Sequence, residues 1–197
     1  MIQVVLAVVA TIIICAALVA WPVHPAKPVV TPVTAAMAVA GSEAITPFLA
    51  KFANHLVALN PNGDPTPWDA SKLAGVQYIA FYYSASWCPP SRAFTPDLVS
   101  FYNEFKPSHP NFEIIFVSDD RSDGDMASYM KTDSMPWPAV RFADVSDPDL
   151  NAGQFCGAGI PCLVLVDRNG NVLSDTYRGG AYVGPDPVVG DIRDMVK

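Results

Sequence analysis

The sequence predicts an α/β domain with a mixed central sheet and helices on both of its faces. Two apolar stretches typical of buried strands, residues 76–83 and 112–117, are each followed by apolar side chains at helical spacing. Two more strand-like stretches, 162–167 and 172–174, flank a hairpin turn at 168–170, where we expect Asn169 and Gly170 to take positive φ. Alternating strands and helices favour parallel pairing and a hairpin requires antiparallel pairing, so the sheet is expected to be mixed.

The N-terminal segment 1–21 is expected to be a membrane anchor. Residues 2–20 are apolar apart from Gln3 and Thr11, and as a helix they would span roughly 28 Å, about the thickness of the bilayer core. A cleaved signal peptide is the alternative, with a possible cleavage site at residues 38–40. Cys15 lies in this apolar segment and is expected to be buried rather than lipidated. We expect a single-pass protein of an extracytoplasmic or organellar compartment, with its orientation open.

The remainder divides into a Pro/Ala-rich linker, residues 22–41, and one domain, residues 42–197. The domain should open with a helix capped by Thr46-Pro47 and carrying Phe48, Leu49, Phe52 and Leu56, followed by a turn over residues 60–65. Three more helices are expected along the chain: one starting near Ser122, one over Pro148 to Phe155, and one capped by Asp186-Pro187.

The strongest chemical signal is Ser-Ala-Ser-Trp-Cys-Pro-Pro-Ser-Arg, residues 84–92. In a C-x-x-C site the first thiolate attacks a disulfide and the second thiol resolves the mixed disulfide. Here Ser91 stands in place of the second cysteine, so Cys88 can attack but needs an outside thiol for resolution. Three interpretations stay open: a natural one-thiol redox protein, a fold whose redox role has decayed, and an engineered Cys-to-Ser trap.

Cys88 is predicted to lie between a strand and the first turn of a helix, because Phe94, Leu98 and Phe101 follow it at helical spacing. At a helix N-terminus the peptide dipoles and free N–H groups favour a thiolate. Trp87 is expected to cover part of the sulfur. A lone cysteine in other contexts is an inert buried residue.

Four stretches together resemble the tryparedoxins and nucleoredoxins of the thioredoxin superfamily. They are Phe-Tyr-Tyr-Ser-Ala-Ser-Trp-Cys-Pro-Pro-Ser-Arg-Ala-Phe-Thr-Pro, Ile-Ile-Phe-Val-Ser-Asp-Asp-Arg-Ser, Met-Pro-Trp-Pro-Ala-Val-Arg-Phe and Gly-Ile-Pro-Cys-Leu-Val-Leu-Val-Asp, in family order within residues 70–175. The resemblance implies a thioredoxin-like fold and descent from a dithiol oxidoreductase. It also implies that Cys88 is the nucleophile, Trp87 its neighbouring aromatic residue, and Ile160-Pro161 a cis-proline turn beside it, which pairs with a substrate chain like an added strand. Tyr82 stands where thioredoxin itself has a buried carboxylate.

Cys156 and Cys162 flank the Ile160-Pro161 turn and are possible alternative thiols. Either one could resolve a mixed disulfide on Cys88, the two could pair with each other, or both could be small buried residues. Trp137, between two prolines, is expected to be structural.

The sequence predicts neither a metal nor a cofactor, because its three histidines are scattered and it has no phosphate-binding glycine loop. The net charge of -7 divides into +1 over residues 1–40 and -8 beyond them, which argues against a nucleic-acid partner. The favoured function is therefore one-thiol exchange by a membrane-anchored protein, with a protein or low-molecular-weight thiol or disulfide as the partner. The alternative is a redox-inactive accessory subunit of a membrane protein complex, whose partners are the other subunits.

Overall fold

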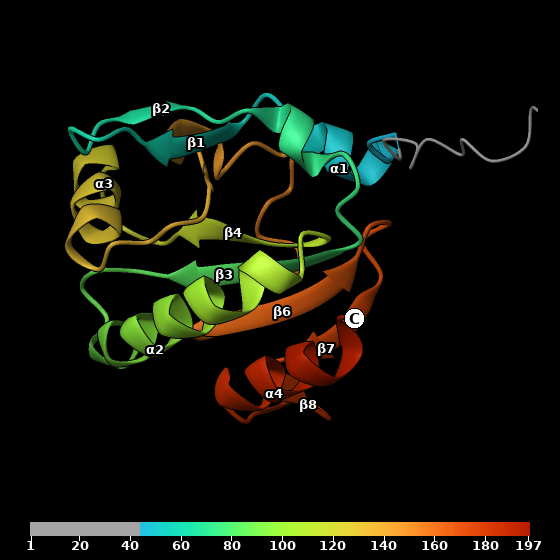
Figure 1. The fold of residues 1–197 in the computed structure, drawn as a ribbon. Coiled ribbons are helices and arrows are strands. Elements are labelled where there is room, and N and C mark those ends of the chain that lie inside the picture. The colour runs from blue at the N-terminus through green and yellow to red at the C-terminus, as the bar shows by residue number, and fades with distance from the viewer. Residues whose placement is uncertain (1–43) are drawn as a thin grey trace, which may run out of the picture. The chain divides into compact units, whose positions relative to one another are not determined.

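The computed structural model describes residues 44–197, which are drawn in colour in Figure 1. The predicted anchor over residues 1–21, including Cys15, and the linker over 22–41 lie outside the described residues. Within residues 44–197, no helix is both long enough and apolar enough to cross a bilayer.

Seven strands form one mixed sheet in the order β2-β1-β5-β4-β3-β6-β7. They are β1 (Leu56–Leu59), β2 (Pro65–Pro67), β3 (Tyr78–Ser84), β4 (Phe112–Ser118), β5 (Ala139–Val140), β6 (Cys162–Asp167) and β7 (Val172–Asp175). Strands β3, β4 and β5 run parallel, whereas β6 pairs antiparallel with β3 and with β7. The prediction of a mixed sheet is confirmed. A separate two-stranded hairpin follows, made of β8 (Tyr177–Arg178) and β9 (Ala181–Tyr182).

Helices cover both faces of the sheet, but unequally. The α-helices are α1 (Pro47–Phe52), α2 (Pro89–Phe105), α3 (Asp123–Thr132) and α4 (Asp186–Met195), and single 3₁₀ turns occur at Ala70–Leu73, Lys106–Ser108 and Phe142–Asp144. Side chains of α2, α3 and α4 pack in one core cluster, and those of α1 pack in the other. Figure 1 shows α2 and α4 running beside the β3 and β6 side of the sheet.

The alternation of side chains along β3 explains the two clusters. Ala80 and Tyr82 belong to the cluster under α2, whereas Ile79, Phe81 and Tyr83 belong to the cluster under α1. All five are buried, so β3 is apolar on both faces, as a central strand flanked by helices must be. Burying one large apolar side chain contributes about 1.5–3 kcal/mol, so this strand anchors the fold on which the site is built.

Two sequence predictions are wrong: the first helix is shorter than predicted, and a later predicted helix does not form. The first helix ends at Phe52, and Leu56 begins β1 instead, where it pairs with Val140 of β5. The helix expected over residues 148–155 is absent from the described structure, which has turns there. The Asp147 carboxylate accepts the backbone N–H of Asp149, and Asn151 has a φ of 49°, so the chain leaves helical geometry.

The ends of two other elements also differ from the prediction. Helix α4 starts at Asp186 itself after Pro185, and no side chain caps it, whereas Ser122 does cap α3. In the turn between β6 and β7 only Gly170 takes positive φ, at 86°. A Cβ there would also lie 2.8 Å from the Phe48 ring, so both backbone and packing require glycine.

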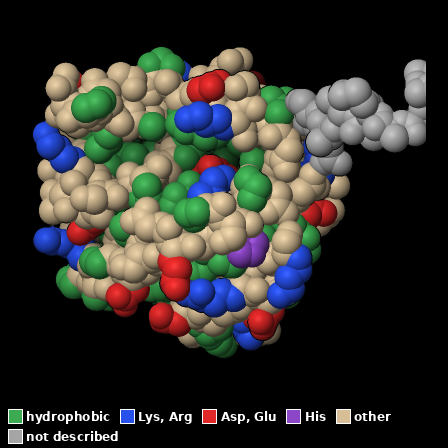
Figure 2. Space-filling model, viewed as in Figure 1, with side chains coloured by type: hydrophobic (Ala, Val, Ile, Leu, Met, Phe, Trp, Pro, Cys, Tyr) green, Lys and Arg blue, Asp and Glu red, His purple; other side chains and the backbone are tan. Residues whose placement is uncertain are grey.

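Figure 2 shows acidic and basic side chains interspersed over the face of the molecule seen in Figure 1. The acidic excess of the chain is therefore not gathered into one patch on this face. Such mixed charge is the ordinary pattern of a solvated surface.

Candidate functional site

Cys88 lies at the junction of strand and helix that the sequence predicts. It is the N-cap residue of α2, with Pro89 and Pro90 in the first turn. Prolines suit this place because the first N–H groups of a helix have no partner inside the helix. The Cys88 side chain makes no cap hydrogen bond, so its sulfur is available for chemistry at the positive end of the helix dipole.

The Cys88 sulfur faces the turn before β6. Its Sγ donates a weak hydrogen bond to the carbonyl oxygen of Ile160 at 3.6 Å, and the Ile160–Pro161 peptide bond is cis. The hydroxyl of Tyr182 donates to the next carbonyl, that of Pro161, at 2.9 Å. The structure thus brings Cys88, Ile160 and Pro161 together across 72 residues of chain.

A cavity of about 440 Å³ opens beside the sulfur, a volume in the usual range of ligand pockets. It lies at the ends of β3 and β4, under the loop that leads to β6, and Asp119 is the one acidic residue in its wall. Its lining residues are Tyr83, Trp87, Cys88, Val117, Ser118, Asp119, Val145, Gly153, Cys156, Gly157, Ala158, Gly159 and Ile160. Cys88 is only 7% exposed, so this cavity is the way by which a small disulfide would reach it.

Trp87 forms part of the cavity wall and is 48% exposed, an unusual state for so large an apolar side chain. Its Nε1 donates to the carbonyl oxygen of Asp119 at 2.9 Å, and the Arg121 guanidinium lies 5.9 Å from the ring centroid. The preceding turn is held by Asp120, whose carboxylate accepts both the N–H and the hydroxyl of Ser86. Trp87 is therefore fixed in an exposed position beside the sulfur.

Ser91 occupies a fully buried position in the first turn of α2, and its hydroxyl has no hydrogen-bond partner among the described residues. A buried hydroxyl without a partner costs about 1–3 kcal/mol, whereas a thiol is a small apolar group that tolerates such a place. The surroundings of position 91 therefore suit a cysteine better than the serine that stands there.

Behind this turn lies a hydrogen-bonded group of hydroxyls that sequence reasoning did not find. The Thr95 hydroxyl donates to the Ser91 carbonyl at 2.8 Å, so it accepts from the hydroxyls of Tyr82 and Tyr129. Ser84 then donates to Tyr129 at 3.0 Å. Because Thr95 has no lone pair left, it cannot accept from the Ser91 hydroxyl.

This group of hydroxyls also gives Tyr82 a place in the site. Burial is the main cause that raises the pKa of Tyr82 and of Tyr129, so both hydroxyls stay protonated as donors. Tyr82 also packs in the core against Phe94, Phe116 and Trp137. Trp137 is fully buried in the same cluster, as expected of a structural residue.

Cys156 and Cys162 come together on the α1 side of the sheet. Cys156 is half-buried in the cavity wall, and Cys162 is fully buried at the start of β6, opposite Tyr83 of β3. The two thiols are neighbours, and the Cys156 Sγ donates to the carbonyl oxygen of Gly157 at 3.3 Å. The neighbouring Cys162 thiol, and then burial, raise the pKa of Cys156, while the neighbouring Cys156 thiol lowers the pKa of Cys162.

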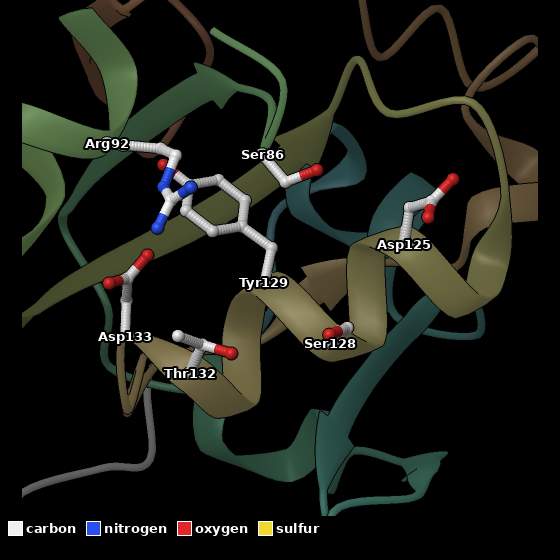
Figure 3. A pocket seen from close by; sticks show the side chains of 7 residues that line it. All are labelled: Ser86, Arg92, Asp125, Ser128, Tyr129, Thr132 and Asp133. Atoms are coloured by element: carbon white, nitrogen blue, oxygen red, sulfur yellow. The ribbon is translucent and has the colours of Figure 1, made fainter. Parts of the chain in front are cut away.

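A second, smaller cavity of about 160 Å³ lies against the opposite side of the α2 N-terminus, and Figure 3 shows its polar lining. Arg92 of α2 and Asp133 after α3 point toward one another there, beside the Tyr129 ring. Burial raises the pKa of Asp133, and the nearby Arg92 charge lowers it in part. One Asp133 carboxylate oxygen is buried without a hydrogen-bond partner among the described residues.

The residues that sequence reasoning missed are Thr95, Tyr129, Asp120 and Tyr182. Thr95 follows Ser91 by one helical turn, and that spacing was a usable signal. The others reach the site through tertiary contacts that leave no local pattern. Within residues 44–197 no group of three or more His, Cys, Asp and Glu side chains is placed to hold a metal ion.

Comparison with known proteins places this geometry in a family. Residues 75–172 match the model of the family described as "Thioredoxin-like". Nucleoredoxin of Danio rerio is 37% identical over 122 residues, covering 62% of this chain and 28% of the relative, and probable nucleoredoxin 1 of Arabidopsis thaliana is 42% identical over 101 residues, covering 51% and 17%. The chain thus spans less than a third of the length of these curated relatives.

Solved structures are similar over nearly their whole length. Thioredoxin from Wuchereria bancrofti is 34% identical with a TM-score of 0.54, and the match covers 73% of this chain and 96% of that protein. Tryparedoxin I from Leishmania major is 30% identical with a TM-score of 0.54, and the match covers 75% and 94%. With its cis-Pro161 turn beside Cys88 and its nucleoredoxin and tryparedoxin relatives, this chain belongs to the thioredoxin-like family.

Proposed function

We propose that the chain carries out one-thiol disulfide exchange through Cys88. The main observation in support is that the Cys88 sulfur, at the N-terminus of α2, borders both the Ile160 carbonyl and a cavity large enough for a small disulfide. Ile160 then supplies backbone groups to a peptide substrate, and Trp87 supplies an exposed apolar surface.

The reaction is an exchange without net oxidation. The Cys88 thiolate attacks one sulfur of the substrate disulfide, a new S–S bond forms to Cys88, and the old S–S bond breaks. The departing thiolate takes a proton from water. Because Ser91 has no sulfur, a further thiol must attack the mixed disulfide to free Cys88.

Both protein and low-molecular-weight disulfides are candidate substrates. A tryparedoxin II that is 27% identical to this chain was solved in complex with glutathionylspermidine, a small cationic thiol compound. Asp119 lines the cavity, and its negative charge acts on the neighbouring Cys156, which supports a preference for such a cationic partner over an anionic one.

The test is capture of the mixed disulfide. The full chain is incubated with glutathione disulfide, and peptide masses are measured under non-reducing conditions. We expect glutathione on the peptide that contains Cys88, and none on that peptide after Cys88→Ser. Modification confined to Cys156 or Cys162 would contradict the proposal, and Asp119→Asn tests the preference for charge by comparing cationic and anionic disulfides.

The Ser91 substitution favours a second candidate, a redox-inactive accessory subunit of a membrane protein complex. The apolar sequence of residues 2–20 supports membrane attachment in either case. Fractionation of cells followed by cross-linking of the full chain distinguishes disulfide exchange from the accessory-subunit role. A stable complex whose assembly is unaffected by Cys88→Ser favours the accessory subunit, whereas partners that are lost with Cys88→Ser favour exchange.

A further inference from the structure

We propose that Cys156 and Cys162 form an internal dithiol that resolves the mixed disulfide on Cys88, in place of the thiol missing at position 91. This inference rests on the proposed exchange at Cys88 and extends it from a single-thiol step to a complete dithiol reaction. Its basis is that Cys88 and Cys156 line one cavity, and that the buried Cys162 is the neighbour of Cys156.

The first observation is that Cys88 and Cys156 share the 440 Å³ cavity. Cys88 is in its wall at the start of α2, and Cys156 is in its wall within the loop before β6. A substrate half bound to Cys88 would therefore occupy a space that Cys156 also faces. The loop between residues 145 and 161 has no helix or strand, and turn hydrogen bonds hold Cys156 in it, since the Cys156 N–H donates to the Gly153 carbonyl at 3.1 Å.

The second observation is that Cys156 has a thiol partner. Cys162, the first residue of β6, lies next to Cys156 and is fully buried, out of reach of an external disulfide. The two positions are six residues apart, on either side of cis-Pro161. One thiol thus faces the cavity, and the other stands behind it, which is the arrangement of a resolving pair.

Resolution of the mixed disulfide on Cys88 takes two thiol-disulfide exchanges, in which electrons and protons balance. In the first, Cys156 gives its proton to water and attacks the Cys88 sulfur as a thiolate, so the Cys88–Cys156 bond forms, the bond from Cys88 to the substrate breaks, and the substrate thiolate leaves. In the second, Cys162 gives its proton to the departed thiolate and attacks Cys156, which frees the Cys88 thiolate. Cys156 and Cys162 are oxidised to a disulfide, and the substrate disulfide is reduced to two thiols.

The test counts thiolates released from 5,5′-dithiobis(2-nitrobenzoate), a chromogenic disulfide, given in less than stoichiometric amount to the full chain. Every variant carries Cys15→Ser. Attack by Cys88 releases one thionitrobenzoate for each reagent molecule, and resolution releases the second. From the parent we expect two thionitrobenzoate molecules for each reagent molecule, and a Cys156–Cys162 disulfide in its peptide map under non-reducing conditions.

The variants separate the steps. Cys156→Ser and Cys156→Ala should keep the rate of the first release, which shows an intact fold, and slow the second at least about tenfold. The Cys162→Ser variant should release both thionitrobenzoate molecules and retain a Cys88–Cys156 disulfide. A second release that persists in Cys156→Ser, at a rate independent of chain concentration, would overturn the internal dithiol. A first release no faster in the parent than in Cys88→Ala would instead overturn the exchange at Cys88.

Discussion

The Thr95 hydroxyl donates to the backbone carbonyl of Ser91 at 2.8 Å, while the Ser91 hydroxyl, one turn away, has no partner among the described residues. Thr95 accepts from Tyr82 and Tyr129, so its hydrogen-bonding capacity is filled. The core behind the redox motif is therefore complete without the hydroxyl of Ser91.

Removing that hydroxyl should not destabilise the protein. We expect Ser91→Ala to leave the free energy of unfolding unchanged or to raise it by up to about 1 kcal/mol, because a buried group without a partner disappears. Urea denaturation at neutral pH measures the change. The matched control is Thr95→Ala, which should lower the free energy of unfolding by about 2 kcal/mol. A loss above about 1 kcal/mol in Ser91→Ala would mean that the hydroxyl is bonded after all.

Restoring a thiol at position 91 should restore internal resolution near α2. In Ser91→Cys, combined with Cys156→Ser, we expect two thionitrobenzoate molecules for each reagent molecule and a disulfide that joins Cys88 to the introduced thiol. The position is fully buried, where a thiol is tolerated. If the double variant released a single thionitrobenzoate, the first turn of α2 would not bring the two sulfurs together.

The buried hydroxyls of Tyr82 and Tyr129 should contribute to stability. Tyr129→Phe removes the donor to Thr95 and the acceptor of Ser84, and we expect it to lower the free energy of unfolding by about 1–2 kcal/mol. Tyr78→Phe is the control, because its ring is half-buried and its hydroxyl is outside this group. Equal changes in the free energy of unfolding for the two substitutions would show that the hydrogen bonds of this group of hydroxyls do not contribute to stability.

Asp133 should make the protein less stable as the pH rises. Burial raises its folded-state pKa above the unfolded value of about 3.9. The stabilisation from the bound proton is thus complete below about pH 4 and is lost as the pH rises through the folded pKa. Asp133→Asn should gain stability relative to the parent over that range, as measured by denaturation at several pH values. Asp149→Asn, an exposed carboxyl, is the control, and a pH profile of Asp133→Asn parallel to the parent would contradict this effect.

Sequence reasoning found the parts of the fold that local pattern determines. Strands β3, β4 and β6 are mainly apolar stretches of six or seven residues, and the sequence predicts all three. The sequence pattern predicts Leu56, the first residue of β1, as the end of a helix, because a strand of four residues shows little periodicity and its partner Val140 is distant in the sequence. Short strands of this kind are defined by their partners rather than by their own sequence.

The same division holds at the site. The motif around Cys88 and the Ile160-Pro161 turn were predictable, because each is a contiguous sequence with a family resemblance. The contacts of Ser86 with Asp120 and of Tyr182 with Pro161 join residues 34 and 21 positions apart. No local signal marks these contacts, since they depend on how the strands and loops are assembled.

The most direct measurement of the central claim is the rate at which Cys88 is alkylated by iodoacetamide at neutral pH, in the folded full chain and in the chain unfolded by guanidinium chloride. The tryptic peptide that ends at Arg92 reports on Cys88 alone. Disulfide exchange at Cys88 predicts alkylation of folded Cys88 about tenfold faster than in the unfolded chain, because the nucleophile of such an exchange is activated by its surroundings. A folded rate equal to or below the unfolded rate would contradict disulfide exchange at Cys88 and leave the accessory-subunit role as the better explanation.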